Sequence, residues 1–146
     1  MDIIEGVSLN FLKIIEHPKG NIMHALRKSD LSFKGFGEAY FSEIHKDEIK
    51  GWKRHKTMVL NLIVPIGEIK FVLFDERPDS ASYMKFWQVN IGSGQYKRLT
   101  VPPMIWMAFQ GVGDERNLLL NIASIEHDPN EAENRDLLNI DFKWEG

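Results

Sequence analysis

The sequence predicts a single all-β domain, a sandwich or barrel of short antiparallel strands. Between residues 57 and 123, apolar and β-branched runs recur at short intervals, separated by turn residues such as Gly, Pro, Asp and Ser. Helical periodicity is scarce. The 146 residues match one ordinary domain, and they contain no repeat, low-complexity tract or linker.

The strands follow from these runs and from the turns between them. Pro65-Ile66-Gly67 separates the first two runs, and Pro102-Pro103 ends the fourth. The predicted strands are 57–64, 69–74, 86–91, 96–101, 105–110 and 117–123. We expect a short helix in the acidic segment 128–136 and an edge strand near the end, at 137–144 (LLNIDFKW).

The composition excludes several classes of protein. A net charge of -3 and a pI near 5.9 argue against general nucleic-acid binding. The absence of Cys rules out disulfides and thiolate metal sites. The apolar runs are shorter than the roughly 18 residues of a membrane helix, so we expect no membrane partner. The first residues, MDIIEGVSLNF, lack the basic region of a signal peptide, and we expect a cytoplasmic protein.

A basic cluster precedes the first predicted strand in this acidic chain. The segment 49–56, IKGWKRHK, contains Lys50, Lys53, Arg54, His55 and Lys56. It is either a solvated strand edge protected by charge or the rim of a pyrophosphate-binding site. Alternation along a strand would place residues 53 and 55 on one face and residues 54 and 56 on the other. The functional interpretation therefore pairs Lys53 with His55 inside the fold.

The order of the motifs resembles the dTDP-4-dehydrorhamnose 3,5-epimerase family over residues 38–130. Lys50-Gly51 stands at the strand entry, Gly67-Glu68 at a hairpin turn, Phe74-Asp75-Glu76-Arg77 after it and Pro102-Pro103 at a later strand. The resemblance implies a cupin jelly roll, a homodimer, a nucleotide sugar as substrate and a role in surface polysaccharide or deoxysugar biosynthesis. It divides the chain into an N-terminal extension (about 1–37), a barrel (about 38–127) and a C-terminal segment (128–146).

The family's catalytic positions are replaced in this chain. The family motif R-G-L-H corresponds to Lys50-Gly51-Trp52-Lys53, which puts Lys53 at the base and Lys50 at a phosphate-binding position. The other replaced positions are Met107 for a His, Asn121 for the acidic Tyr, Leu60 for a Lys and Phe71 for an Asp. We therefore expect the standard double epimerisation to be lost.

A second resemblance keeps proton-transfer chemistry open. KGWKRHK and VPPMIW are similar to the H-x-H-K and I-P-P-x-x-W motifs of nucleotide-sugar 3,4-ketoisomerases, with His55 as the second His and Lys56 as the Lys. Histidine is the residue type that titrates near neutrality. The catalytic candidates are therefore His55, Lys53 and Asn121. Only one His of the metal-binding cupin pattern is kept, so we expect neither a metal nor a cofactor.

The remaining candidates for substrate binding each have a structural alternative. Asn61 is either a core amide or a sugar contact, and Trp106 either stacks on the substrate or packs in the core. Glu38 and Tyr40 either reach a neighbouring site or occupy ordinary edge positions. With Lys50, Arg54, Lys56 and Met107, these residues complete the predicted binding set. The competing function is a non-catalytic cupin that binds a nucleotide sugar or a partner enzyme.

Overall fold

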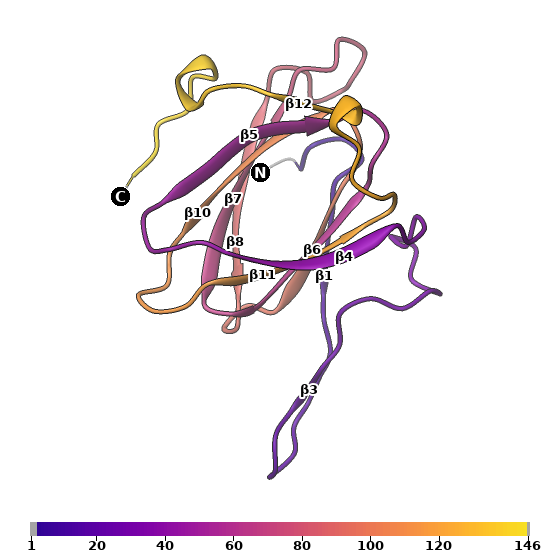
Figure 1. Ribbon diagram of the computed structural model, residues 1–146, viewed down its shortest axis with the longest axis vertical. Helices are drawn as coiled ribbons and strands as arrows, with labels where there is room; N and C mark the ends of the chain where they lie inside the picture. The colour runs from indigo at the N-terminus through magenta and orange to yellow at the C-terminus, as the bar shows by residue number, and fades with distance from the viewer. Residues whose placement is uncertain (1–2, 146) are drawn as a thin grey trace.

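The computed structural model describes residues 3–145, which fold into two five-stranded antiparallel sheets that face each other (Figure 1). One sheet has the strand order β1-β9-β6-β11-β4 and the other β12-β5-β10-β7-β8. This is the predicted all-β jelly roll of the cupins. Within residues 3–145, helical structure is confined to two 3-10 turns, η1 (Pro129–Glu131) and η2 (Leu137–Asn139).

The strands occur in chain order as follows: β1 (Ser8–Phe11), β2 (Ile14–Ile15), β3 (Ile22–Met23), β4 (Glu38–Glu43), β5 (Ile49–His55), β6 (Leu60–Ile66), β7 (Glu68–Asp75), β8 (Phe86–Gly92), β9 (Lys97–Val101), β10 (Ile105–Gly111), β11 (Leu118–Ala123) and β12 (Ala132–Asn134). All six predicted strands are confirmed, with shifted ends. The first begins at Leu60, because residues 57–59 form the turn that enters it.

The turn between β6 and β7 shows how local sequence sets the hairpins. Gly67 has φ +81°, a conformation that costs glycine little and other residues much. A Cβ at this position would lie 2.2 Å from the carbonyl oxygen of Arg116, which leaves no room for a side chain. The predicted Pro65-Ile66-Gly67 turn is thus required both by the backbone and by its neighbours.

The main core lies between the sheets, and a second cluster covers the outer face of the β5-containing sheet. Alternate residues of β6, such as Leu60, Leu62 and Val64, point into the main core. In the second cluster Trp52 and Trp106 pack with Ile140, Phe142 and Trp144 of the C-terminal segment. The predicted edge strand at 137–144 is therefore wrong. These residues form η2 and an irregular segment, because their apolar side chains cover a sheet face instead of pairing along an edge.

The N-terminal segment has two parts. β1 pairs with β9 and completes the first sheet, so this stretch of the predicted extension belongs to the fold. β2 and β3 form a hairpin that reaches away from the two sheets (Figure 1). Its side chains Ile14, Ile15, Ile22 and Met23 are exposed by 36–57%.

Candidate functional site

A cavity of about 460 Å³ opens between the two sheets. Its polar wall contains residues from β4, β5 and β11, together with the segment that follows β12. The polar and charged residues of the lining are Tyr40, Ser42, Lys50, Lys53, His55, Asn121, Asn134, Arg135 and Asp136. Leu60, Met107, Phe109 and Leu119 give it an apolar floor. Concave sites of this size, largely apolar with a few converging polar groups, are typical of small-molecule binding.

Alternation along β5 sorts the basic cluster as the sequence predicted. Lys53 and His55 line the cavity. Arg54 points to the other face, where it donates to Glu133 at 2.5 Å and lies 4.6 Å from the ring centroid of Trp106. Lys56 follows the end of β5 and is exposed outside the cavity lining. The strand therefore presents one lysine and one histidine side by side to a ligand.

His55 is held by a buried carboxylate. Its Nδ1 lies 2.7 Å from Oε1 of Glu131, and both side chains are at most 14% exposed. Oε2 of Glu131 accepts from the backbone N–H groups of Thr57 and Met58, at 2.9 and 2.8 Å. Burial alone would raise the pKa of Glu131, but these hydrogen bonds hold it below its ordinary value. The ionised carboxylate accepts a hydrogen bond from Nδ1. We therefore assign the ring proton to Nδ1 and the free lone pair to Nε2.

Tyr40 forms a second polar unit on the opposite sheet. Tyr40 and Asn121 are direct partners in the β4–β11 ladder, and Nδ2 of Asn121 donates to the phenol oxygen at 3.0 Å. Burial, reinforced by the nearby charge of Glu38, raises the pKa of Tyr40, so the phenol remains protonated at neutral pH. Oδ1 of Asn121 is buried without a hydrogen-bond partner among residues 3–145. The cavity thus contains a protonated phenol and a free amide acceptor.

The two cavity lysines differ in their contacts. Nζ of Lys50 donates to the carbonyl oxygen of Glu43 at 2.7 Å and approaches Oγ of Ser42 at 3.4 Å. The side chain of Lys53 forms neither a hydrogen bond nor an ion pair within residues 3–145. A lysine that faces a cavity without a counter-charge is available to an anionic or carbonyl-bearing ligand.

The chain is 37% identical in sequence to the dTDP sugar isomerase from Desulfovibrio desulfuricans G20. The match covers 97% of this chain and 92% of that one, with a TM-score of 0.92. The chain belongs to the dTDP-4-dehydrorhamnose 3,5-epimerase-like cupin family. The resemblance found in the sequence is thereby confirmed.

Two further proteins are more distantly similar, one in fold and one in sequence. The dTDP-4-dehydrorhamnose 3,5-epimerase from Sulfolobus tokodaii superposes with a TM-score of 0.84 at 19% identity, covering 97% of this chain and 84% of that one. "Probable low-salt glycan biosynthesis epimerase Agl13" of Haloferax volcanii is 24% identical over 123 residues, 83% of this chain and 79% of that protein. No family model matches the sequence.

Measured against the family motifs, the cavity unites most of the predicted site. Of the replaced or conservatively changed positions, Lys50, Lys53, Leu60, Met107 and Asn121 line it, as do His55 and Tyr40. Phe71 does not, because it is fully buried in the main core. Met107 and Lys53 are direct partners in the β10–β5 ladder. The cavity therefore brings together most of the positions that the sequence resemblance assigned to the family's site.

Five predicted binding residues lie elsewhere. Arg54 and Trp106 belong to the outer face of the β5-containing sheet, because they occupy outward positions of their strands. Asn61 is 3% exposed, accepts from Thr100 at 2.6 Å and donates to the carbonyl oxygen of Ser32, so the core-amide alternative describes its position. Glu38, the first residue of β4, accepts from the backbone N–H of His127. Lys56 is likewise outside the lining, and none of these five residues borders the cavity.

The sequence reasoning missed the contribution of the segment 131–136. Glu131 bonds to His55, while Asn134, Arg135 and Asp136 line the cavity. The sequence predicts only an acidic segment with a short helix here. No spacing in the sequence links Glu131 to His55 on β5, 76 residues earlier. The one available signal is that a buried histidine on a strand needs a carboxylate partner. Several carboxylates of this segment satisfy that condition equally well in the sequence.

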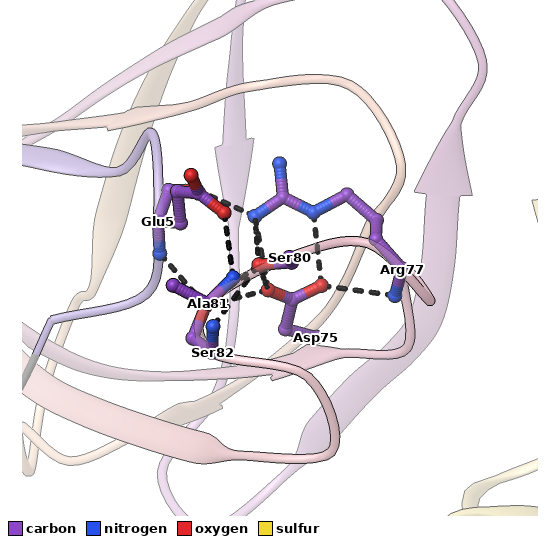
Figure 2. Close-up of polar contacts among 6 residues, drawn as sticks. All are labelled: Glu5, Asp75, Arg77, Ser80, Ala81 and Ser82. Carbon is purple, nitrogen blue, oxygen red and sulfur yellow. Dashed lines mark hydrogen bonds and ion pairs between the residues drawn. The ribbon is translucent and has the colours of Figure 1, made fainter.

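In the Phe74-Asp75-Glu76-Arg77 motif, Asp75 and Arg77 have a structural role outside the cavity lining (Figure 2). Asp75 is fully buried and accepts from Nε and Nη2 of Arg77 and from the hydroxyls of Ser80 and Ser82. Burial opposes ionisation of Asp75, but these hydrogen bonds lower its pKa far below the ordinary range. Arg77 also donates to the carbonyl oxygen of Glu5, so the network fastens the N-terminal segment to the loop after β7.

Within residues 3–145, no group of three or more His, Cys, Asp or Glu side chains is arranged to hold a metal ion. The same part of the chain contains no helix of the length and apolar character needed to span a membrane.

Proposed function

We propose that this protein is a nucleotide-sugar isomerase or epimerase that transfers a proton on a carbon next to a carbonyl group. His55 acts as the base and Tyr40 as the acid. The observation that carries the proposal is the His55–Glu131 contact of 2.7 Å on the wall of the cavity. A buried carboxylate that fixes the tautomer of an imidazole is a recurrent way to prepare a general base.

Each proton has a defined donor and acceptor in this reaction. Nε2 of His55 removes the proton from the carbon beside the carbonyl, while Lys53 stabilises the oxygen of the resulting enolate. For an epimer, the phenol of Tyr40, on the opposite sheet, donates a proton to the same carbon from the other face, and the phenolate and the protonated His55 then exchange their proton with solvent. For the isomeric ketone, Tyr40 protonates the carbonyl oxygen, the protonated His55 returns its proton to the former carbonyl carbon, and the phenolate takes the proton of the neighbouring hydroxyl. Neither outcome requires a redox cofactor.

The family's acid and base positions support a displaced pair. The base position holds Lys53, and His55 is the next residue along β5 with the same orientation. The acid position holds Asn121, and Tyr40 is its direct partner on β4. The proposed base therefore lies two residues from the family's base position, on the same face of β5. The proposed acid lies directly opposite the family's acid position, on the neighbouring strand. Lys53 is then free to polarise the substrate carbonyl, and Oδ1 of Asn121 to accept from a sugar hydroxyl.

The substrate class follows from charge and from the family. Lys50 and Lys53 place two cationic groups on the wall of one cavity, which suits the diphosphate of a nucleotide sugar. The dTDP sugar isomerase relative makes dTDP-linked 4-keto sugars the first substrates to test.

We also propose a homodimer in which the β2–β3 hairpin packs on a second copy. The hairpin has two residues in each strand and exposes four apolar side chains. An isolated two-stranded hairpin is marginally stable in water, so cover from another chain would stabilise it.

Solvent-deuterium incorporation tests the proposed reaction. The protein is incubated with dTDP-4-keto-6-deoxyglucose in deuterated water, and deuterium at C3 and C5 is followed by NMR. We expect incorporation at a carbon beside the ketone, lost in His55→Asn and Tyr40→Phe. The matched controls, His127→Asn and Tyr83→Phe, change the same residue types outside the cavity and should retain it. Nucleotide binding without incorporation would instead favour the non-catalytic cupin.

A further inference from the structure

The part of β5 that bears Lys53 and His55 forms one of its two ladders with β12, a strand of three residues at the edge of its sheet. The register pairs Ala132 with His55 and Asn134 with Lys53. So short an edge strand has few ladder hydrogen bonds of its own, so contacts at its two ends must hold it in place.

The first end is fixed by Glu131, whose carboxylate bonds to His55 and whose carbonyl oxygen accepts from the backbone N–H of Lys56 at 2.8 Å. The second end is fixed by Arg135. Its backbone exchanges two hydrogen bonds of 3.0 Å with Trp52. Its guanidinium forms a bidentate pair with Glu76, at 3.0 and 2.7 Å, and lies 4.3 Å from the ring centroid of Trp106. Glu76 follows β7 and is therefore anchored independently of β12.

The Arg135–Glu76 pair, called the clamp below, is a strong ion pair for a partly exposed position. Both side chains are about one-third exposed, at 32% and 30%, and a bidentate arginine–carboxylate pair fixes direction as well as distance. The hydrogen bonds from Arg135 lower the pKa of Glu76, which keeps the pair ionised at neutral pH. Glu76 borders neither the cavity nor the reacting groups.

From these contacts we infer that Glu76 is a positioning residue: by clamping Arg135 it sets the place of β12, and so keeps Glu131 aligned on Nδ1 of His55. The predicted effect on catalysis rests on the proposed function. The predicted effect on the tautomer of His55 does not. Small displacements of a catalytic group are costly, since misplacement by about 1 Å can reduce a rate by about 100-fold.

The experiment compares Glu76→Gln with Glu68→Gln, a half-buried glutamate at the other end of β7 whose carboxylate accepts from Asn90. Nitrogen-15 NMR of the His55 ring reports its tautomer, and deuterium incorporation reports kcat, KM and the pH profile. In Glu76→Gln we expect mixed tautomers, a kcat lowered by about 10- to 100-fold and a changed pH profile, with KM altered much less. Glu76→Asp, which keeps the charge, should restore part of the rate.

Unchanged His55 ring signals and an unchanged pH profile in Glu76→Gln would overturn the inference. An equal effect of Glu68→Gln would overturn it as well, because the loss would then reflect general destabilisation. If the unaltered protein catalyses no exchange, the proposed function fails, while the tautomer comparison still decides the role of Glu76.

Discussion

Oε1 of Glu131 lies 2.7 Å from Nδ1 of His55, although the two residues are 76 positions apart in the chain. The contact joins the segment that follows the barrel to the C-terminal end of β5. It also explains the buried position of Glu131, which would be costly for a carboxylate without partners. In the proposed function, the same contact gives the base His55 a defined tautomer.

Replacing Glu131 by Gln should slow proton transfer. The amide keeps the size of the side chain but removes the charge that stabilises the protonated imidazole. We expect deuterium incorporation to fall by at least about 10-fold, as commonly follows when an orienting partner is lost. The exposed Glu126 provides the control, and Glu126→Gln should leave the rate unaltered. An unimpaired Glu131→Gln protein would mean that the contact supports the fold alone.

The strands could be predicted because their signals are local. Apolar runs such as 117–123 and turns such as Pro65-Ile66-Gly67 lie within a few residues of one another, and the structure keeps them. Alternation along β5 correctly separated Lys53 and His55 from Arg54 for the same reason. It is a property of one strand and needs no knowledge of the others.

The other parts of the site depend on packing between distant segments. Nothing in the sequence near Trp106 shows that Phe142 and Trp144 cover its side of the sheet, so the sequence leaves both substrate stacking and core packing open for Trp106. Nor does the spacing of Glu131 or Arg135 reveal their partners on β5 and after β7. For Tyr40 the sequence leaves a neighbouring site and an ordinary edge position open, because its contact with Asn121 depends on the β4–β11 register.

Lys50 and Lys53 should dominate the binding of a nucleotide diphosphate. We expect Lys50→Met and Lys53→Met each to weaken binding of dTDP by about 10-fold, the usual scale for one charge-assisted hydrogen bond. Lys56→Met removes the same charge outside the cavity and should have little effect. Calorimetric titration with dTDP at low and high salt measures the affinity of each variant and its salt dependence, since ionic contacts at an open cavity weaken with ionic strength. Equal losses in all three variants would point to a general effect of surface charge.

The exposed hairpin predicts the state of association. The unaltered protein should have the mass of a dimer in light scattering at micromolar concentration. Ile14→Asp combined with Ile22→Asp should shift it towards a monomer, because two charges would be buried at the contact. Leu138→Asp places a charge on another exposed apolar residue and should leave the mass unchanged. A strictly monomeric unaltered protein would contradict the proposed homodimer.

Asp75 should be the most pH-sensitive contributor to stability among the groups of Figure 2. Its pKa is lowered in the folded state, whereas an unfolded aspartate titrates near about 3.9. Its stabilising effect is therefore complete above roughly pH 5 and is lost as the pH falls towards the folded-state pKa. Asp75→Asn removes the charge at every pH and leaves Arg77 with an incomplete partner.

We expect Asp75→Asn to lower the free energy of unfolding by about 3–5 kcal/mol at pH 7, the usual cost of breaking a buried ion pair. Urea unfolding at pH 7 and pH 3 measures this. The loss should shrink at pH 3, because the unaltered protein has by then begun to lose the same contribution. Asp79→Asn, an exposed change in the same loop, should show neither effect. A loss that stays constant from pH 7 to pH 3 would show that the hydroxyl contacts of Ser80 and Ser82, rather than the charge of Asp75, stabilise the loop.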